Sequence, residues 1–210
     1  MAYSYLSVAL RDQNKLAEAK AAYLKAIELQ PHDADLHHKV SWLLSTSPDA
    51  RFRDSALAVQ LGKKAVELVP ENGIFWTTLG VAQYRAGRQR DAIAALEMSM
   101  QLRNGGDAKA WFFLAMAHWQ LGDKVQARKW YDQAAQWTDK HQPQDEELSR
   151  FRSEAAELLE VGTKSGNRST GSAGLGLALV AEYVRVLNLT LTPSLNMGTK
   201  RFNLWVGFYQ

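Results

Sequence analysis

The chain has 210 residues, of which 46% are hydrophobic and 22% are charged, and its formal net charge at pH 7 is +3. These proportions are typical of a soluble globular protein and argue against a disordered chain, a collagen or a membrane bundle. The sequence contains no cysteine, which excludes a disulfide framework and cysteine-ligated zinc. No apolar run approaches the roughly 20 residues that cross a bilayer, and the first residues lack the basic and apolar regions of a signal peptide. We therefore expect a cytoplasmic protein that has no membrane contact.

The positive charge is concentrated in the C-terminal part of the chain. Residues 162–210 contain five Lys and Arg against a single acid, whereas residues 1–161 contain 20 basic and 21 acidic residues. A nucleic-acid-binding surface needs basic side chains clustered on one face of a folded element. This distribution predicts no nucleic-acid partner.

Residues 1–141 contain four copies of one spacing pattern. One column of small side chains recurs in steps of 39, 34 and 35 residues, at Ala26, Ala65, Ser99 and Ala134. A second column recurs upstream in steps of 34, 39 and 35 residues, at Tyr3, His37, Trp76 and Trp111. The shared period of about 34 residues predicts helix-turn-helix units at about 1–33, 34–72, 73–107 and 108–141.

The second unit is predicted to contain a lengthened turn between its two helices. Its second helix comes five residues late relative to its first helix, which places the additional residues within 45–54. This segment is rich in Ser, Pro and Asp, which are typical of loops and of helix N-caps.

The third unit reads Trp76-x-x-Leu79-Gly80-x-x-x-Tyr84-x-x-Gly87, and the fourth reads Trp111-x-x-Leu114-Ala115-x-x-x-Trp119-x-x-Gly122. Both resemble the consensus of the tetratricopeptide repeat, in which small residues let two helices approach and large residues fill the space between units. The resemblance implies an all-α fold, an α-solenoid of about four repeats that serves as a protein-protein interaction scaffold and not as an enzyme. Units three and four also resemble the repeats appended to bacterial eukaryote-like Ser/Thr protein kinases, which implies a link to signal transduction.

Both ends of the repeat array differ from a regular unit. The chain begins inside the first helix of unit one, without the polar cap that a solenoid normally has, and this suggests a fragment of a longer parent protein. After the fourth unit, apolar residues recur at helical spacing at Leu148, Phe151, Ala155, Leu158 and Leu159. They predict a terminal capping helix over residues 145–161.

The composition changes at residue 162. Residues 162–173 are rich in Gly and Ser and predict a flexible linker, and residues 174–210 predict a short helix followed by a β-hairpin. Residues 174–206, with Gly174 and Gly176 at the start of the helix, resemble the last part of the ATP-binding domain of histidine kinases. That resemblance implies a phosphate-binding role for these two glycines, through free backbone N–H groups at a helix N-terminus. The alternative, which we favour, is a packed appendage, because short glycine motifs often arise by chance; the kinase interpretation stays as the second hypothesis.

Catalytic and metal-binding patterns are absent from the sequence. No histidine has a partner at metal-ligand spacing, and neither a nucleophile elbow nor a pair of catalytic carboxylates is present. We therefore expect no cofactor, no metal and no catalytic residues.

The inner groove of the predicted solenoid is the candidate binding site. Helical geometry directs four positions of the first helix of each unit toward this groove. The residues predicted to bind a partner there are His38, Trp42, Thr77, Val81, Tyr84, Lys109, Phe112, Met116 and Trp119. Their apolar and aromatic character favours a peptide or a helix of a protein partner. The alternative for Tyr84 and Trp119 is that they pack against a neighbouring helix.

Overall fold

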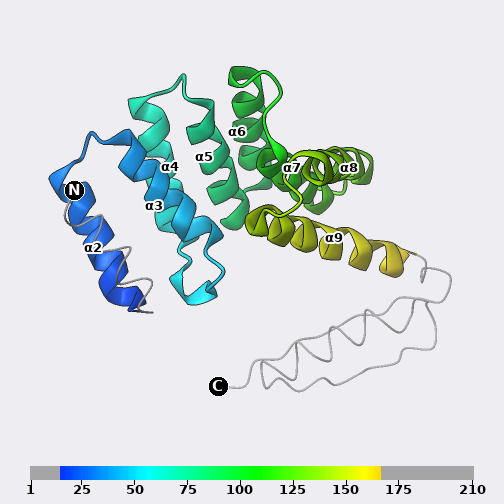
Figure 1. The fold of residues 1–210 in the computed structure, drawn as a ribbon, viewed down its shortest axis with the longest axis horizontal. Helices are drawn as coiled ribbons and strands as arrows, with labels where there is room; N and C mark the ends of the chain where they lie inside the picture. Colours follow the sequence, from blue (N-terminus) through cyan, green and yellow to red (C-terminus); the bar gives the residue numbers. More distant parts are fainter. Residues whose placement is uncertain (1–14, 167–210) are drawn as a thin grey trace, which may run out of the picture. The chain divides into compact units, whose positions relative to one another are not determined.

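The computed structural model describes residues 15–166, which form eight α-helices and one 3₁₀ turn and contain no strand. Figure 1 shows them following one another in chain order. The elements are α2 (Leu16–Leu29), α3 (Ala34–Thr46), η1 (Ala50–Phe52), α4 (Ser55–Leu68), α5 (Gly73–Arg85), α6 (Gln89–Leu102), α7 (Ala108–Gln120), α8 (Lys124–His141) and α9 (Glu146–Gly166). The all-α solenoid predicted from the sequence is confirmed for these residues.

The chain divides between Val161 and Gly162 into two units, and the contacts below belong to the first. The helix expected in the first half of unit one, the linker, the C-terminal helix and the hairpin lie largely or wholly outside the described residues. The two glycines proposed to bind phosphate, Gly174 and Gly176, also lie outside them.

The helices pack as three successive hairpins. Helix α3 packs on α4, α5 on α6 and α7 on α8, and each hairpin also contacts the next. The first helices of the hairpins contact one another in turn, α3 with α5 and α5 with α7. We call α3, α5 and α7 the A helices. The surface that their side chains form together is called the A-helix face. The A helices form a continuous layer, as expected when stacked repeats bury their apolar sides against their neighbours.

Polar side chains and glycines set the helix ends. Asp33, Asp54, Asp107 and Asp123 each accept a hydrogen bond from a backbone N–H in the first turn of the following helix, over 2.9–3.1 Å. Such N-caps satisfy donors that have no partner within the helix. At the other ends of α5 and α7, the glycines at 87 and 122 have φ values of 75° and 86°, a left-handed conformation that favours glycine.

The inserted turn of the second unit packs against the first unit. It contains η1, whose Phe52 side chain is buried, and η1 contacts α2. The carboxylate of Asp54 forms an ion pair with Lys20 of α2, and its backbone N–H donates to the Leu44 carbonyl over 3.1 Å. The position of the insertion is confirmed, and its contacts with α2 connect the first repeat to the second.

Helix α7 lies in the interior of the second half of the solenoid. Every residue from Ala108 to Ala117 except Lys109 is buried. A helix that is apolar on all sides must be enclosed on all sides. Helices α5, α8 and α9 supply that enclosure, since Tyr84, Tyr131 and Phe151 each contact aromatic rings of α7.

The close approach of α5 and α6 at Gly80 gives a test of the packing. A Cβ atom at this position would lie 2.6 Å from Leu96 Cγ and 3.1 Å from the Ala92 carbonyl oxygen. We expect Gly80→Ala to lower the free energy of unfolding in urea by about 1–3 kcal/mol, because the core must shift to accommodate the methyl group. The control is Gln101→Ala on the exposed side of α6, which should change it by less than about 0.5 kcal/mol. Equal unfolding curves for wild type and Gly80→Ala would contradict the close contact.

Candidate partner-binding face

The residues predicted to line the groove lie together on the A-helix face, but they differ in exposure. His38, Trp42, Lys109 and Trp119 are partly exposed. The other five are buried, namely Thr77, Val81, Tyr84, Phe112 and Met116. The apolar stripe that we expected to be open to solvent is therefore closed in this structure. The reason is packing between helices: the Phe112 ring meets that of Tyr131 in α8 at 6.0 Å, and Val81, Tyr84 and Met116 belong to the same buried cluster.

The main apolar contact between α9 and the A-helix face is made by Phe151. Its buried ring meets Phe113 of α7 at a centroid distance of 5.0 Å and Trp42 of α3 at 6.1 Å, both nearly edge-on. Leu148, one turn earlier on the same side of α9, is also buried. Edge-to-face pairs at these distances stabilise aromatic clusters beyond the area that they bury.

Two carboxylates of α9 meet cations of the A helices. Glu147 pairs with Lys109 and accepts a hydrogen bond from Trp42 Nε1 over 3.0 Å. The Lys109 ammonium lies 5.0 Å from the centroid of the Trp42 ring, within the range of a cation–π contact. Glu154 pairs with Arg85, whose Nη2 donates to Glu154 Oε2 over 2.7 Å.

The guanidinium of Arg85 lies against aromatic rings and is only partly satisfied. It lies 5.1 Å from the centroid of Phe113 and 5.7 Å from that of Tyr84. Its Nε is buried and has no hydrogen-bond partner. A buried donor that stays unpaired costs free energy, and the contact with α9 leaves the Nε donor of this cation unused.

Tyr84 is a packing residue. Its ring meets Phe113 at 5.4 Å, and its hydroxyl accepts a hydrogen bond from Gln120 over 3.1 Å. Burial, reinforced by the negative charge of Glu154, raises the pKa of Tyr84 to about 12. The structure thus favours the packing alternative for Tyr84. Trp119 stays partly exposed, with the Lys124 ammonium 5.3 Å from its ring centroid.

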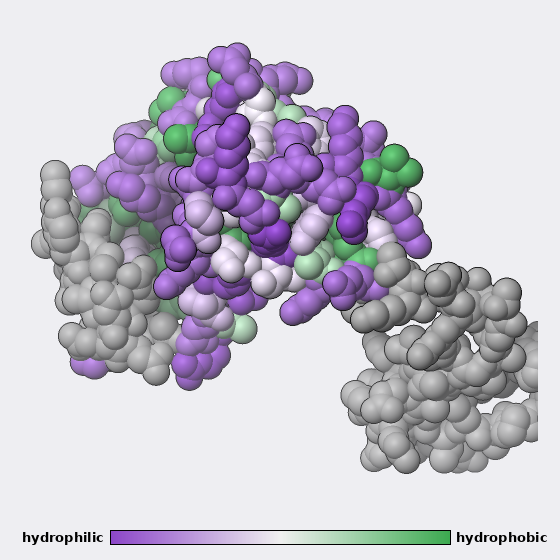
Figure 2. All heavy atoms as spheres, turned by 45° about the vertical axis from the view of Figure 1, so that its right-hand side comes forward, coloured by the Kyte–Doolittle hydropathy of each residue, from purple (hydrophilic) through white to green (hydrophobic). Residues whose placement is uncertain are grey.

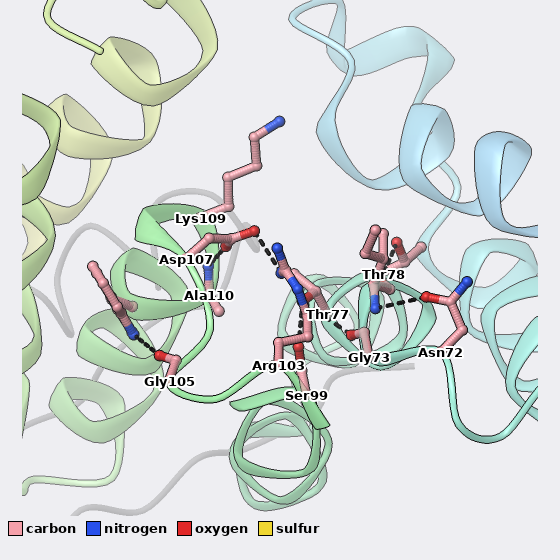
Figure 3. A network of polar contacts seen from close by, with 12 residues as sticks. Asn72, Gly73, Thr77, Thr78, Ser99, Arg103, Gly105, Asp107, Lys109 and Ala110 are labelled. Atoms are coloured by element: carbon pink, nitrogen blue, oxygen red, sulfur yellow. Dashed lines mark hydrogen bonds and ion pairs between the residues drawn. The ribbon is translucent and has the colours of Figure 1, made fainter. Parts of the chain in front are cut away.

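The open part of the A-helix face is a shallow pocket of about 200 Å³ between α3, α5 and the start of α7. Its lining comprises His38, Trp42, Ile74, Thr77, Thr78, Arg103, Asp107 and Lys109. Figure 3 shows Arg103 directed at Asp107, over 2.6 Å, and Lys109 extending away from that pair. Four of these residues, His38, Trp42, Thr77 and Lys109, were predicted to bind a partner, and Ile74 occupies one of the positions predicted to face the groove. Thr78, Arg103 and Asp107 were missed. Two of the missed ones, Arg103 and Asp107, belong to the connection between α6 and α7, which the helical pattern does not register.

His38 is held in one orientation at the edge of this pocket. Its ring stacks on Phe75 at 5.0 Å, and its Nδ1 lies 2.7 Å from Thr78 Oγ1. Burial lowers the pKa of His38 below its usual 6.5, and the charges of Lys39 and Lys109 act in the same direction, against that of Asp35. The imidazole is therefore neutral at pH 7 and presents a polar but uncharged edge to the pocket.

The described surface has other hollows, among them one of about 390 Å³ beside Pro143 and Arg150 and one of about 330 Å³ beside Gly87 and Leu121. Hydrophilic side chains predominate on the face shown in Figure 2, and the hydrophobic ones form small separate patches. In the described residues, no three His, Asp or Glu side chains gather where they could hold a metal ion. None of the described helices combines the length and apolar character needed to cross a membrane.

Comparisons with known proteins agree with this architecture. The tetratricopeptide repeat family model matches residues 1–33 and 108–141, so these repeats are present in the chain. No curated protein matches the chain significantly.

Several solved structures share the fold. The structure described as MamA MSR-1 C2 has a TM-score of 0.55 and 20% identity, over 66% of this chain and 76% of that one. MamA 41-end from Desulfovibrio magneticus RS-1 has a TM-score of 0.55 and 15% identity, over 67% and 76%. A further structure of MamA protein has a TM-score of 0.55 and 18% identity, over 82% and 94%. At these identities the likeness concerns the fold.

The raised pKa of Tyr84 predicts a loss of stability at alkaline pH. Between the unfolded value of 10 and the folded value of about 12, the unfolded chain releases this proton before the folded chain does. Rising pH therefore favours unfolding in that interval, and the contribution of Tyr84 is fully present below pH 10. We expect the free energy of unfolding to fall less steeply between pH 10 and 11.5 in Tyr84→Phe than in wild type. Parallel pH profiles would contradict the buried, protonated phenol.

Proposed function

We propose that this chain is a non-catalytic scaffold that binds a peptide or a helix of a partner protein on its A-helix face. The fold supports a protein-protein interaction role, and the pocket beside Trp42 supports the choice of face. The partly exposed indole of Trp42 and the side chain of Ile74 both line this pocket, and the exposed fraction of Ile74 is 48%. Interface energy is usually concentrated in a few aromatic and aliphatic anchors of this kind.

The polar groups of the pocket suit a backbone or a polar side chain of a ligand. Thr77 and Thr78 line the pocket with hydroxyl groups that already bond Ser99 and His38, and His38 adds a neutral imidazole. Arg103 and Lys109 are each paired with a carboxylate, Asp107 and Glu147, so the pocket is not a strongly charged anion site. A mainly apolar pocket with a few directed polar groups is typical of a specific binding site.

The cellular setting is part of the same hypothesis. A cytoplasmic location follows from the composition, and a link to signal transduction follows from the resemblance of the third and fourth units to repeats appended to bacterial kinases. Neither nucleic acid nor membrane is proposed as a partner.

The binding role is tested with peptides selected on the full chain. A displayed library of 12–20-residue peptides is panned on the protein, and the affinity of each selected peptide is measured by fluorescence anisotropy. We expect Ile74→Asp to weaken binding by about tenfold or more, corresponding to about 1.4 kcal/mol, because it puts a charge into the apolar part of the pocket.

The matched control is Leu121→Asp. Leu121 is exposed to a similar fraction, 46%, but lies at the turn between α7 and α8. This change should leave the affinity within about twofold of wild type. Equal losses in the two variants, or none in either, would contradict binding at the pocket.

The kinase alternative has a separate test. The scaffold proposal expects no saturable binding of a fluorescent ATP analogue, at millimolar concentration with Mg²⁺, to the full chain. Saturable binding that Gly174→Ala and Gly176→Ala abolish would instead support a nucleotide site in the C-terminal segment.

A further inference from the structure

Helix α9 makes contacts that a regular solenoid does not predict. In such a fold each repeat contacts only its neighbours, and α9 follows the fourth unit directly. Yet Glu147 binds the indole of Trp42, and Arg150 Nη2 donates to the Thr46 carbonyl over 2.9 Å. Both contacts reach α3, in the second unit, more than 100 residues earlier. Helix α9 therefore lies across the A-helix face and touches α3, α5 and α7. Figure 1 shows its first turn close to α5 and α7.

The contacts have the form of an amphipathic helix docked on a receptor surface. Leu148, Phe151 and Ala155 are buried at spacings of three and four residues, the pattern of anchors on one helix face. A carboxylate lies on either side of the aromatic anchor, four residues before it at Glu147 and three residues after it at Glu154. Each of them meets a cation of the A helices.

We propose that α9 is an intramolecular ligand of the A-helix face, and that the partner is an acidic amphipathic helix that displaces it. The partner helix carries an aromatic anchor with one carboxylate four residues before it and another three residues after it. It takes the place of Phe151, Glu147 and Glu154 against Phe113, Lys109 and Arg85. This inference rests on the proposed binding role of the A-helix face and names the partner's chemistry.

Two features make α9 a displaceable occupant. It is the last helix of the first unit, joined to α8 only through residues 142–145, so that its release breaks no other helix connection. Its pairs with Lys109 and Arg85 are partly exposed, so water can solvate these charged groups when α9 leaves.

The experiment uses a fluorescein-labelled synthetic peptide with the sequence of residues 145–161 as the probe and the full chain as receptor. A ligand whose site is occupied most of the time binds with an affinity reduced by the fraction of open molecules. Phe151→Ala weakens the internal helix and enlarges that fraction. We therefore expect the Phe151→Ala chain to bind the peptide at least about tenfold more tightly than the wild-type chain does.

Charge reversal identifies the docking position. Arg85→Glu, added to Phe151→Ala, should weaken peptide binding by about tenfold or more. A peptide with arginine at the position of Glu154 should restore it, because the pair is then re-formed with opposite signs. No gain in affinity in a folded Phe151→Ala chain, or a loss that the altered peptide does not restore, would overturn the proposal.

Two controls keep these outcomes distinct. If Phe151→Ala lowers helicity in circular dichroism, the milder double variant Glu147→Gln and Glu154→Gln takes its place, with the same expected gain in affinity.

Size-exclusion chromatography coupled to light scattering tests for exchange of α9 between two chains. A dimer that Phe151→Ala dissociates would make a second copy the occupant and overturn the intramolecular assignment. The comparison of Ile74→Asp with Leu121→Asp uses other residues and other peptides. A negative result there would contradict the proposed binding role, whereas a negative result with the α9 peptide would contradict only the displacement of α9.

Discussion

The enclosure of α7 is the constraint on which the rest of this structure depends. A helix without a polar side is stable in water only when neighbours cover all of it. Helix α5 covers one side and α8 another, but a stack that stopped at α8 would leave the ring of Phe113 and its neighbours facing solvent. Helix α9 completes the enclosure with Phe151. The element that stabilises the last repeat is therefore the same one that closes the candidate binding face.

The charges at the contact between α9 and the A-helix face favour an acidic partner helix. Arg85 and Lys109 each lie against an aromatic ring, Phe113 and Trp42, so their positions are fixed by packing as well as by charge. Cations held in this way recognise carboxylates at a defined separation along a helix, which contributes more to specificity than to affinity. An uncharged or basic helix of equal hydrophobicity would leave both cations without partners, and this penalty discriminates against it.

The sequence predicted the repeats well because their spacing has local causes. Gly80 and Leu96 mark where two helices approach, and Gly87 and Gly122 mark where the first helices of two units end, so the period of the repeats could be taken from residue type alone. The docking of α9 has no such local cause. The pattern of Leu148, Phe151 and Ala155 predicts an apolar helix face, but it does not say which surface that face meets. Only the folded arrangement brings residue 147 to residue 42. The predicted exposure of Val81, Phe112 and Met116 was wrong because they belong to a buried cluster built from several helices, which a single-helix pattern does not show.

Because α9 occupies the binding face, a partner must bind tightly enough to displace it. If α9 must leave before a ligand can bind, the apparent affinity is the intrinsic affinity multiplied by the fraction of molecules in which α9 is released. A helix that reproduces only the aromatic anchor gains too little to compete with a segment tethered to the same chain, whose effective concentration is high. A helix that also supplies both carboxylates, and an acceptor for Arg85 Nε, gains contacts that α9 does not make. The internal helix therefore makes binding selective. A partner helix binds only when it has the same anchor and carboxylates as α9 and adds an acceptor for Arg85 Nε.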